Sequence, residues 1–135
     1  MDAQQKTIAQ RCLDGSYDNT MSFPEGLRAL AEAGFEGYHV DYRLNTRTYY
    51  LSNGETVVLT NPHDHGAVGA QFNQPEIAAA IKWAQLSPPD YDYVAFNKKV
   101  TANGCSGYIV SLLGRRVLYF GRTAETHVEH FPAAP

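Results

Sequence analysis

Residues 34–40 have the sequence Gly-Phe-Glu-Gly-Tyr-His-Val, and residues 104–110 have the sequence Gly-Cys-Ser-Gly-Tyr-Ile-Val. The likeness extends without a gap over the stretches 34–62 and 104–132, in which nine of 29 aligned positions are identical. The identical pairs lie 70 residues apart and include glycine, tyrosine and proline. Because a fixed-period repeat is the signature of a repeated supersecondary unit, the sequence predicts an internal duplication.

The sequence around the first copy predicts two helices followed by three strands. Ser22 and Glu25 form a Ser-x-x-Glu capping box with Pro24 in the first turn, and Gly34 supplies a left-handed helix end. From Gly37 onward, apolar and polar residues alternate, which is typical of a half-buried strand. We therefore expect helices over residues 2–14 and 23–33, and strands over residues 37–43, 47–51 and 55–59.

The second copy is expected to repeat this order. Asn73 and Glu76 form another capping box, and Asn103-Gly104 ends a further helix. Together the elements predict an α+β fold in which antiparallel meanders are covered by helices and related by a pseudo-twofold axis. The meanders are expected to join edge to edge into one sheet, because pairing removes two exposed edges. The strands of this copy are expected over residues 107–113, 116–121 and 125–131.

The length of 135 residues suits a single domain. We expect this domain to span residues 1–135 and to consist of two repeats, at about 1–62 and 71–132. A loop over residues 61–71, rich in Gly, His and Pro, joins them. Loops of about this length without secondary structure are often functional or mobile.

Composition excludes several classes of function. The formal net charge is −3 and no segment gathers Lys and Arg, which argues against a nucleic-acid partner. No apolar run approaches the roughly 20 residues that span a bilayer. The first residues lack the basic start and apolar core of a signal peptide. We therefore expect no membrane partner and a cytoplasmic location.

The sequence predicts no cofactor and no catalytic residue, because it has neither a Gly-rich phosphate loop nor a nucleophile elbow. Cys12 and Cys105 stand alone, without C-x-x-C spacing. Free cysteine is among the most buried residue types. Both thiols are expected to be buried and unreactive.

Positions at which the two copies differ are candidates for specialisation. The first strand carries His39, Asp41 and Arg43 at alternate positions, whereas the counterpart positions in residues 109–113 carry isoleucine, serine and leucine. One interpretation is that the first face meets water while the second face is covered. The other is that a His-Asp-Arg cluster lies in a cleft between the repeats and binds an anionic or polar ligand.

The repeat also relates Glu55 to Glu125, each at the start of the third strand of its unit. Across a pseudo-twofold axis these carboxylates can face each other and share a proton or grip a cation. Alternatively, both are solvated. Matched tyrosines either pack across strands or line a pocket for a planar ligand. The ligand-binding candidates are His39, Asp41, Arg43, Tyr49, Glu55, Tyr119, Arg122 and Glu125.

Histidines near carboxylates raise the question of a metal site. The central loop contains His63 and His65, and the last strand contains His127 and Glu129, which share a face because side chains alternate along a strand. Transition metals accept imidazole together with carboxylate. A site requires these four residues to converge; otherwise they form a polar loop and a partly exposed strand.

Two stretches carry a family resemblance. They are Ala-Gly-Phe-Glu-Gly-Tyr-His-Val-Asp-Tyr at residues 33–42, and the segment that runs from Gly104 through Arg122 to His-Val-Glu-His-Phe-Pro at residues 127–132. Both resemble a small bacterial family of unknown function, some of whose members are labelled "phage envelope protein". The resemblance covers nearly the whole chain and brings no catalytic residues with it.

Three hypotheses about function follow. The first is a non-catalytic protein that binds a small molecule or peptide in a cleft between its repeats. The second is an interaction or assembly protein, forming a homodimer through an exposed strand edge and related to phage or stress biology. The third is a small enzyme that uses histidine and carboxylate, with or without a metal.

Overall fold

A computed structural model, which describes residues 1–132, shows an α+β fold of four helices and six strands. The helices are α1 (Ala3–Asp18), α2 (Phe23–Glu32), α3 (Gln74–Leu86) and α4 (Tyr93–Ala102). The strands are β1 (Phe35–Asp41), β2 (Thr46–Leu51), β3 (Thr56–Thr60), β4 (Cys105–Ser111), β5 (Arg116–Gly121) and β6 (Thr126–His130). The predicted order of helix, helix and three strands occurs twice. The duplication itself stays a prediction, and residues 133–135 of the expected domain lie outside the described part.

All six strands form one antiparallel sheet in the order β3-β2-β1-β4-β5-β6, so the expectation that the meanders join edge to edge is confirmed. The joint is the β1–β4 ladder, which centres on the pair His39 and Ile109. On either side, Gly37 pairs with Ser111 and Asp41 pairs with Gly107. His39 and Ile109 are equivalent positions of the two copies, and the flanking pairs are exchanged, because Gly37 corresponds to Gly107 and Asp41 to Ser111. The register therefore obeys a twofold relation about the central pair.

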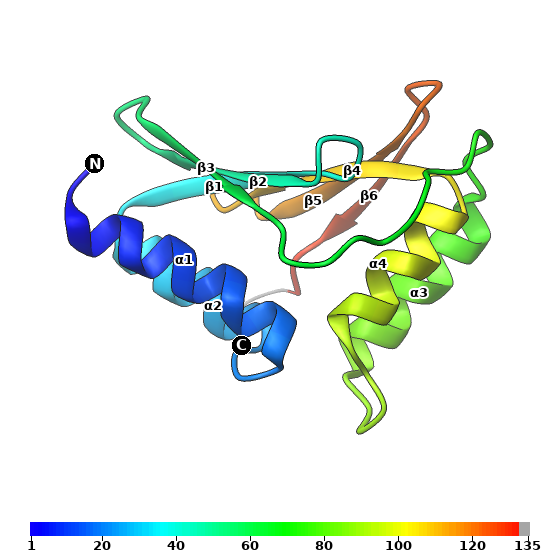
Figure 1. The fold of residues 1–135 in the computed structure, drawn as a ribbon, viewed down its shortest axis with the longest axis horizontal. Helices are drawn as coiled ribbons and strands as arrows, with labels where there is room; N and C mark the ends of the chain where they lie inside the picture. Colours follow the sequence, from blue (N-terminus) through cyan, green and yellow to red (C-terminus); the bar gives the residue numbers. More distant parts are fainter. Residues whose placement is uncertain (133–135) are drawn as a thin grey trace.

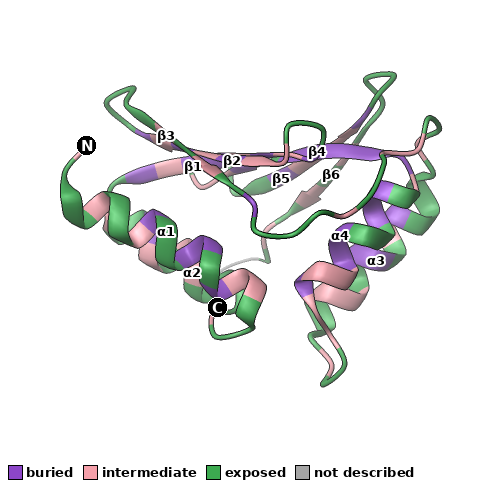
Figure 2. Cartoon of the chain, viewed as in Figure 1, coloured by how far each residue is buried: buried purple, intermediate pink, exposed green. Residues whose placement is uncertain are grey.

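All four helices lie on one face of the sheet, as two antiparallel pairs that diverge from each other (Figure 1). The central loop, residues 61–73, runs beneath the sheet between the two pairs and is drawn in green in Figure 1. Figure 2 shows the buried residues where the helices and the sheet face each other. Tyr38 and Val40 of β1 and Tyr108 and Val110 of β4 point into this core. None of the described helices is both long and apolar enough to cross a bilayer.

The opposite face of the sheet has no covering helix (Figure 1). A row of side chains in register crosses this face from edge to edge: Val58, Thr48, His39, Ile109, Leu118 and Val128. Ile109 is 43% exposed and Val58 is 60% exposed. The interpretation that this face of β4, the counterpart of β1 in the second copy, is covered is therefore wrong. Both strands present these residues to the same open side, because β1 and β4 are neighbours in one sheet.

The helix ends follow the predicted capping chemistry, with two differences. At the start of α3, Asn73 Oδ1 accepts from the Glu76 backbone N–H at 3.3 Å, but the Glu76 side chain makes no return bond within the described residues, so the predicted capping box is only half formed. Ser22 and Glu25 form the expected capping box, and Asp2 forms another with Gln5. Helix α1, however, continues past Gly15 to Asp18, beyond the end predicted from the sequence. Gly15 is required for close packing, since a Cβ there would lie 2.6 Å from the Met21 Cβ. The glycine therefore marks a helix contact, and the helix stops at Asn19, which adopts the left-handed conformation.

Replacing Gly37 by alanine tests the close approach of the two halves. A Cβ at this position would lie 2.3 Å from the Val110 carbonyl oxygen, in the ladder that joins β1 to β4. Because two central strands must separate to admit it, we expect Gly37→Ala to lower the free energy of unfolding by about 2–3 kcal/mol or more. Urea unfolding followed by circular dichroism measures this loss.

Gly54→Ala is the matched control, since Gly54 has a φ of +93° but nothing within 4 Å of the added atom. We expect it to lose only about 1 kcal/mol. Equal losses in the two variants would contradict the close approach.

Candidate functional site

A cavity of about 340 Å³ opens between the two halves of the chain. Three segments meet there: the turn between β1 and β2, the central loop, and the turn between β5 and β6. The first two belong to the first half and the linker, and the third belongs to the second half. The lining residues are Tyr42, Arg43, Asn45, Asp64, His65, Gly66, Ala67, Val68 and Arg122.

The cavity contains two guanidinium groups and one carboxylate. Arg122 Nη1 donates to the Val68 carbonyl oxygen at 3.4 Å, a long bond that leaves its other donors free. Arg43 forms no side-chain hydrogen bond or ion pair within residues 1–132. Asp64 Oδ1 accepts from the Gly66 backbone N–H at 3.0 Å. This bond fixes the loop and uses one of the two carboxylate oxygens as an acceptor. The lining therefore carries an excess of positive charge and several unused donors.

Unsatisfied polar atoms gather beside these arginines. Both ring nitrogens of His65 are shielded from solvent and have no partner within the described residues, and the same is true of Asn45 Oδ1. A buried polar group without a partner costs roughly 1–3 kcal/mol. The His65 ring rests edge-on against Tyr42, with the centroids 4.9 Å apart. The cavity wall thus holds an aromatic ring and an imidazole whose hydrogen-bonding capacity is unused.

Tyr42 forms the inner end of the cavity. Its hydroxyl donates to Asn97 Oδ1 in α4 at 2.7 Å, and this bond fixes the ring. Burial raises the pKa of Tyr42 well above its ordinary value, because the phenolate form would lose its hydration. Tyr42 therefore stays a neutral phenol and supplies no negative charge.

Three of the predicted site residues, Arg43, His65 and Arg122, lie together in this cavity. His39 and Asp41 do not join them, so the predicted His-Asp-Arg cluster is not formed. The side chains of His39 and Asp41 point to the uncovered face, and the chain turns directly after β1, which carries Arg43 away. Asp41 Oδ1 holds that turn by accepting from the Arg43 backbone N–H at 2.9 Å.

His39 and the two predicted tyrosines have packing roles. The His39 ring lies 5.7 Å from the Phe120 ring on the uncovered face. Tyr49 and Tyr119 are buried in the core, under β2 and β5, and do not line the cavity. They pack across strands against their neighbours Tyr38 and Tyr108, with centroids 5.3 Å apart in each case. Of the two interpretations of the matched tyrosines, the structure therefore shows packing across strands for Tyr49 and Tyr119, and not the lining of a pocket for a planar ligand.

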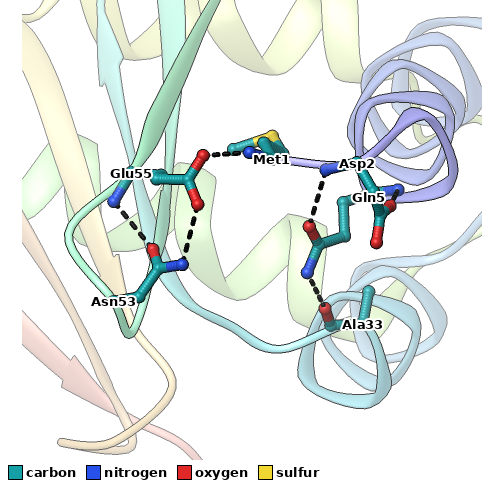
Figure 3. A network of polar contacts seen from close by, with 6 residues as sticks. All are labelled: Met1, Asp2, Gln5, Ala33, Asn53 and Glu55. Carbon is teal, nitrogen blue, oxygen red and sulfur yellow. Dashed lines mark hydrogen bonds and ion pairs between the residues drawn. The ribbon is translucent and has the colours of Figure 1, made fainter.

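Glu55 and Glu125 do not face each other. They lie in the β2–β3 and β5–β6 hairpins, which project from opposite ends of the sheet (Figure 1). Figure 3 shows the Glu55 carboxylate accepting from the Met1 amino group and from Asn53 Nδ2, the latter at 2.8 Å. The hydrogen bond from the Met1 amino group lowers the pKa of Glu55 most, and the hydrogen bond from Asn53 lowers it further. The predicted carboxylate pair is wrong, because a twofold axis through the sheet centre places corresponding turns far apart.

The predicted metal ligands do not converge. His127 Nε2 donates to Glu129 Oε1 at 2.7 Å, so these two share a face as expected. His63 instead stacks on Tyr17, with centroids 5.5 Å apart, while His65 belongs to the cavity. Within residues 1–132 no group of three or more His, Cys, Asp or Glu side chains could hold a metal ion.

Sequence reasoning missed several residues of the cavity, namely Tyr42, Asn45 and the loop residues 64 and 66–68. The signal that could have found the loop was its length and its Gly-, His- and Pro-rich composition. Tyr42 and Asn45 carry no pattern of their own. Their position depends on the path of the central loop beneath the sheet.

No protein-family model matches the chain, and no curated protein matches it. Function is therefore inferred from the geometry of the cavity.

The two thiols are predicted to be unreactive in the native protein. Cys12 and Cys105 are both buried, as expected from the sequence. Burial raises the pKa of Cys105 to about 11 and also raises that of Cys12. Near pH 8, Cys105 would be ionised in only about one molecule in a thousand. We expect labelling by Ellman's reagent to be at least a hundredfold slower in the native than in the urea-unfolded protein.

The unfolded protein should release two equivalents of the coloured thiolate, one for each cysteine. Rapid labelling of either thiol in the native state would contradict this burial.

Proposed function

We propose that the protein binds, without catalysis, a small molecule that carries a carboxylate or phosphate group, in the cavity between its two halves. The observation that carries the proposal is the convergence of Arg43 and Arg122 on one cavity. The arginines come from opposite halves of the chain. A ligand that bridges them would be held at the junction.

The chemistry of the lining suits an anion. Guanidinium groups match carboxylate and phosphate oxygens with paired N–H donors, and such charge-assisted bonds are stronger than neutral ones. The volume lies at the lower end of the range for small-molecule sites. Asp64 adds one acceptor, so ligands that combine an anionic group with a hydroxyl or an amine fit best. The edge of Tyr42 and the side chain of Val68 supply an apolar wall.

Thermal shift measurements with matched ligand pairs test this function. The panel compares small phosphates and carboxylates with their neutral alcohol or amide analogues at constant ionic strength. A ligand that prefers the native state raises the melting temperature by mass action. We expect at least one anion to do so and its neutral analogue to have no effect. Arg122→Met should weaken that binding roughly tenfold to a hundredfold, since it removes charge-assisted hydrogen bonds.

Arg28→Met, which removes an exposed arginine of α2, is the matched control and should leave the affinity unchanged. Binding that survives in the double variant Arg43→Met/Arg122→Met would show that the ligand sits elsewhere. A panel in which no anion raises the melting temperature would count against the proposal.

A second candidate function is assembly, and the uncovered sheet face favours it. Ile109 and Val58 are exposed there, together with Val128 at 37% exposure. The same face carries Asp41 and Arg116, one acidic and one basic residue. In an isologous contact between two copies of the chain, Asp41 of one copy can lie against Arg116 of the other, and the apolar row packs against the same row. The strand-edge homodimer proposed from the sequence would instead use β3 or β6.

Sedimentation velocity distinguishes these arrangements. If the face pairs two copies, the wild-type protein should be a dimer and Ile109→Asp a monomer. Leu86→Asp changes an equally apolar, 72% exposed residue of α3 outside the sheet and should leave the dimer intact. A dimer that survives Ile109→Asp would favour the strand edges. A wild-type monomer would contradict the assembly function.

A cytoplasmic location, membership of the resembling bacterial family and the absence of nucleic-acid and membrane partners stay predictions. They are compatible with a small binding protein of modest negative charge.

A further inference from the structure

Three polar side chains from different elements form a hydrogen-bonded network behind the cavity between the halves. At its centre is Asn97 of α4, which is only 2% exposed. Its Oδ1 accepts from the Tyr42 hydroxyl at 2.7 Å, and its Nδ2 donates to the Tyr17 hydroxyl of α1 at 3.3 Å. The side-chain amide of Asn97 therefore joins the turn after β1 to α1.

Each tyrosine of this network supports one histidine of the central loop. The His63 ring stacks on Tyr17, with the centroids 5.5 Å apart and the ring planes inclined by 29°. The His65 ring lies edge-on against Tyr42, with the centroids 4.9 Å apart. Asp64, which stands between the two histidines, lines the cavity. The network therefore supports both sequence neighbours of a cavity residue.

Ring contacts hold this part of the loop in place. Within residues 1–132, no hydrogen bond ties residues 62–67 to a helix or a strand. Both ring nitrogens of His65 are shielded and have no partner in the same range, so packing holds this ring. The loop is anchored differently further on, where the Gly69 backbone N–H donates to the Thr101 carbonyl oxygen of α4 at 2.9 Å. The stretch around Asp64 thus depends on the two tyrosine rings.

We propose that Asn97 is a positioning residue for the anion cavity, although it does not line that cavity. Asn97 fixes the rings of Tyr17 and Tyr42, and these rings hold the loop stretch that carries Asp64 into the cavity. A buried amide bonded at both of its ends keeps one orientation, because any other would leave polar groups unpaired. The proposal rests on the anion-binding function for its effect on affinity, and it couples the occupied cavity to the contact between α1 and α4.

Proton NMR of the five histidines tests this role. Aromatic rings displace the chemical shifts of nearby protons, so the C2 protons of His63 and His65 report on their contacts with Tyr17 and Tyr42. The two signals are assigned from the variants His63→Gln and His65→Gln. In Asn97→Ala we expect both signals to move toward their positions in the urea-unfolded protein, because the tyrosine rings lose the group that fixes them.

Tyr42→Phe is a milder variant, since it keeps the ring and removes only the hydroxyl that donates to Asn97. It should move the His65 signal even where Asn97→Ala fails to fold. The control is Ile81→Ala, which removes most of a buried side chain of α3 and lowers stability outside the network. Both histidine signals should stay in place in this control. Unmoved signals in the Asn97 and Tyr42 variants, or an equal movement in the control, would overturn the proposal.

Titration with inorganic phosphate, followed by the same signals, measures the consequence for binding. We expect Asn97→Ala to bind phosphate roughly tenfold more weakly, as when one hydrogen bond of the ligand is lost, although Arg43 and Arg122 are intact. Ile81→Ala should keep the wild-type affinity. An unchanged affinity in Asn97→Ala would overturn the positioning role. If phosphate does not bind the wild-type protein, this counts against the anion-binding function, whereas the histidine signals still decide the role of Asn97.

Discussion

The β1–β4 ladder is the contact on which the rest of the structure depends. It is the only strand pairing between the two halves among the described residues, and it turns two three-stranded meanders into one sheet. Its register about His39 and Ile109 places equivalent residues of the halves at equivalent positions. Gly37 and Gly107 permit this, because a Cβ at either would lie within 2.4 Å of a carbonyl oxygen of the opposite strand. The ladder thus fixes where every other element lies.

From this pairing follows the one-sided architecture. With antiparallel neighbours in one sheet, both helix pairs fall on the same face, and the other face keeps its alternate side chains without a covering layer. The central loop must cross beneath the sheet to connect the halves (Figure 1). Its passage brings His65 and Asp64 beside the turn after β1 and near Arg122 of the second half. The candidate binding cavity is therefore a consequence of how the two halves are linked.

The core is unusual in its polar content. A guanidinium lies among tyrosines, and the Tyr42 hydroxyl is bonded to Asn97. Buried polar groups of this kind are stable only when their partners are in place. Satisfied bonds such as that of Tyr42 fix the positions of the helices on the sheet. The unsatisfied ring nitrogens of His65 lie within the wall of the cavity between the halves.

Local signals in the sequence predicted the elements well. The capping box at Ser22 gave the start of α2, because capping depends only on neighbours in the chain. Gly15 misled the prediction of the end of α1, since its role is a contact with Met21, which no local pattern reveals. Similarly, His127 and Glu129 were correctly placed on one face, whereas the distance of His127 from His63 depends on the whole fold.

The sequence by itself determined the α+β class and the repeated order of elements, because hydrophobic periodicity, caps and turns are local and recur at a fixed spacing. The pairing of β1 with β4, which makes one sheet of the two meanders, joins segments far apart in the chain and was decided by the tertiary structure. Only the tertiary structure decided which polar residues meet. Arg43, His65 and Arg122 are far apart in the chain and come together through the strand order and the path of the loop. Arg47 occupies a strand position whose counterpart in the second half is valine. The alternation of β2 places Arg47 on the same face as the buried Tyr49 and Leu51. Only the fold shows that tyrosine rings surround its guanidinium.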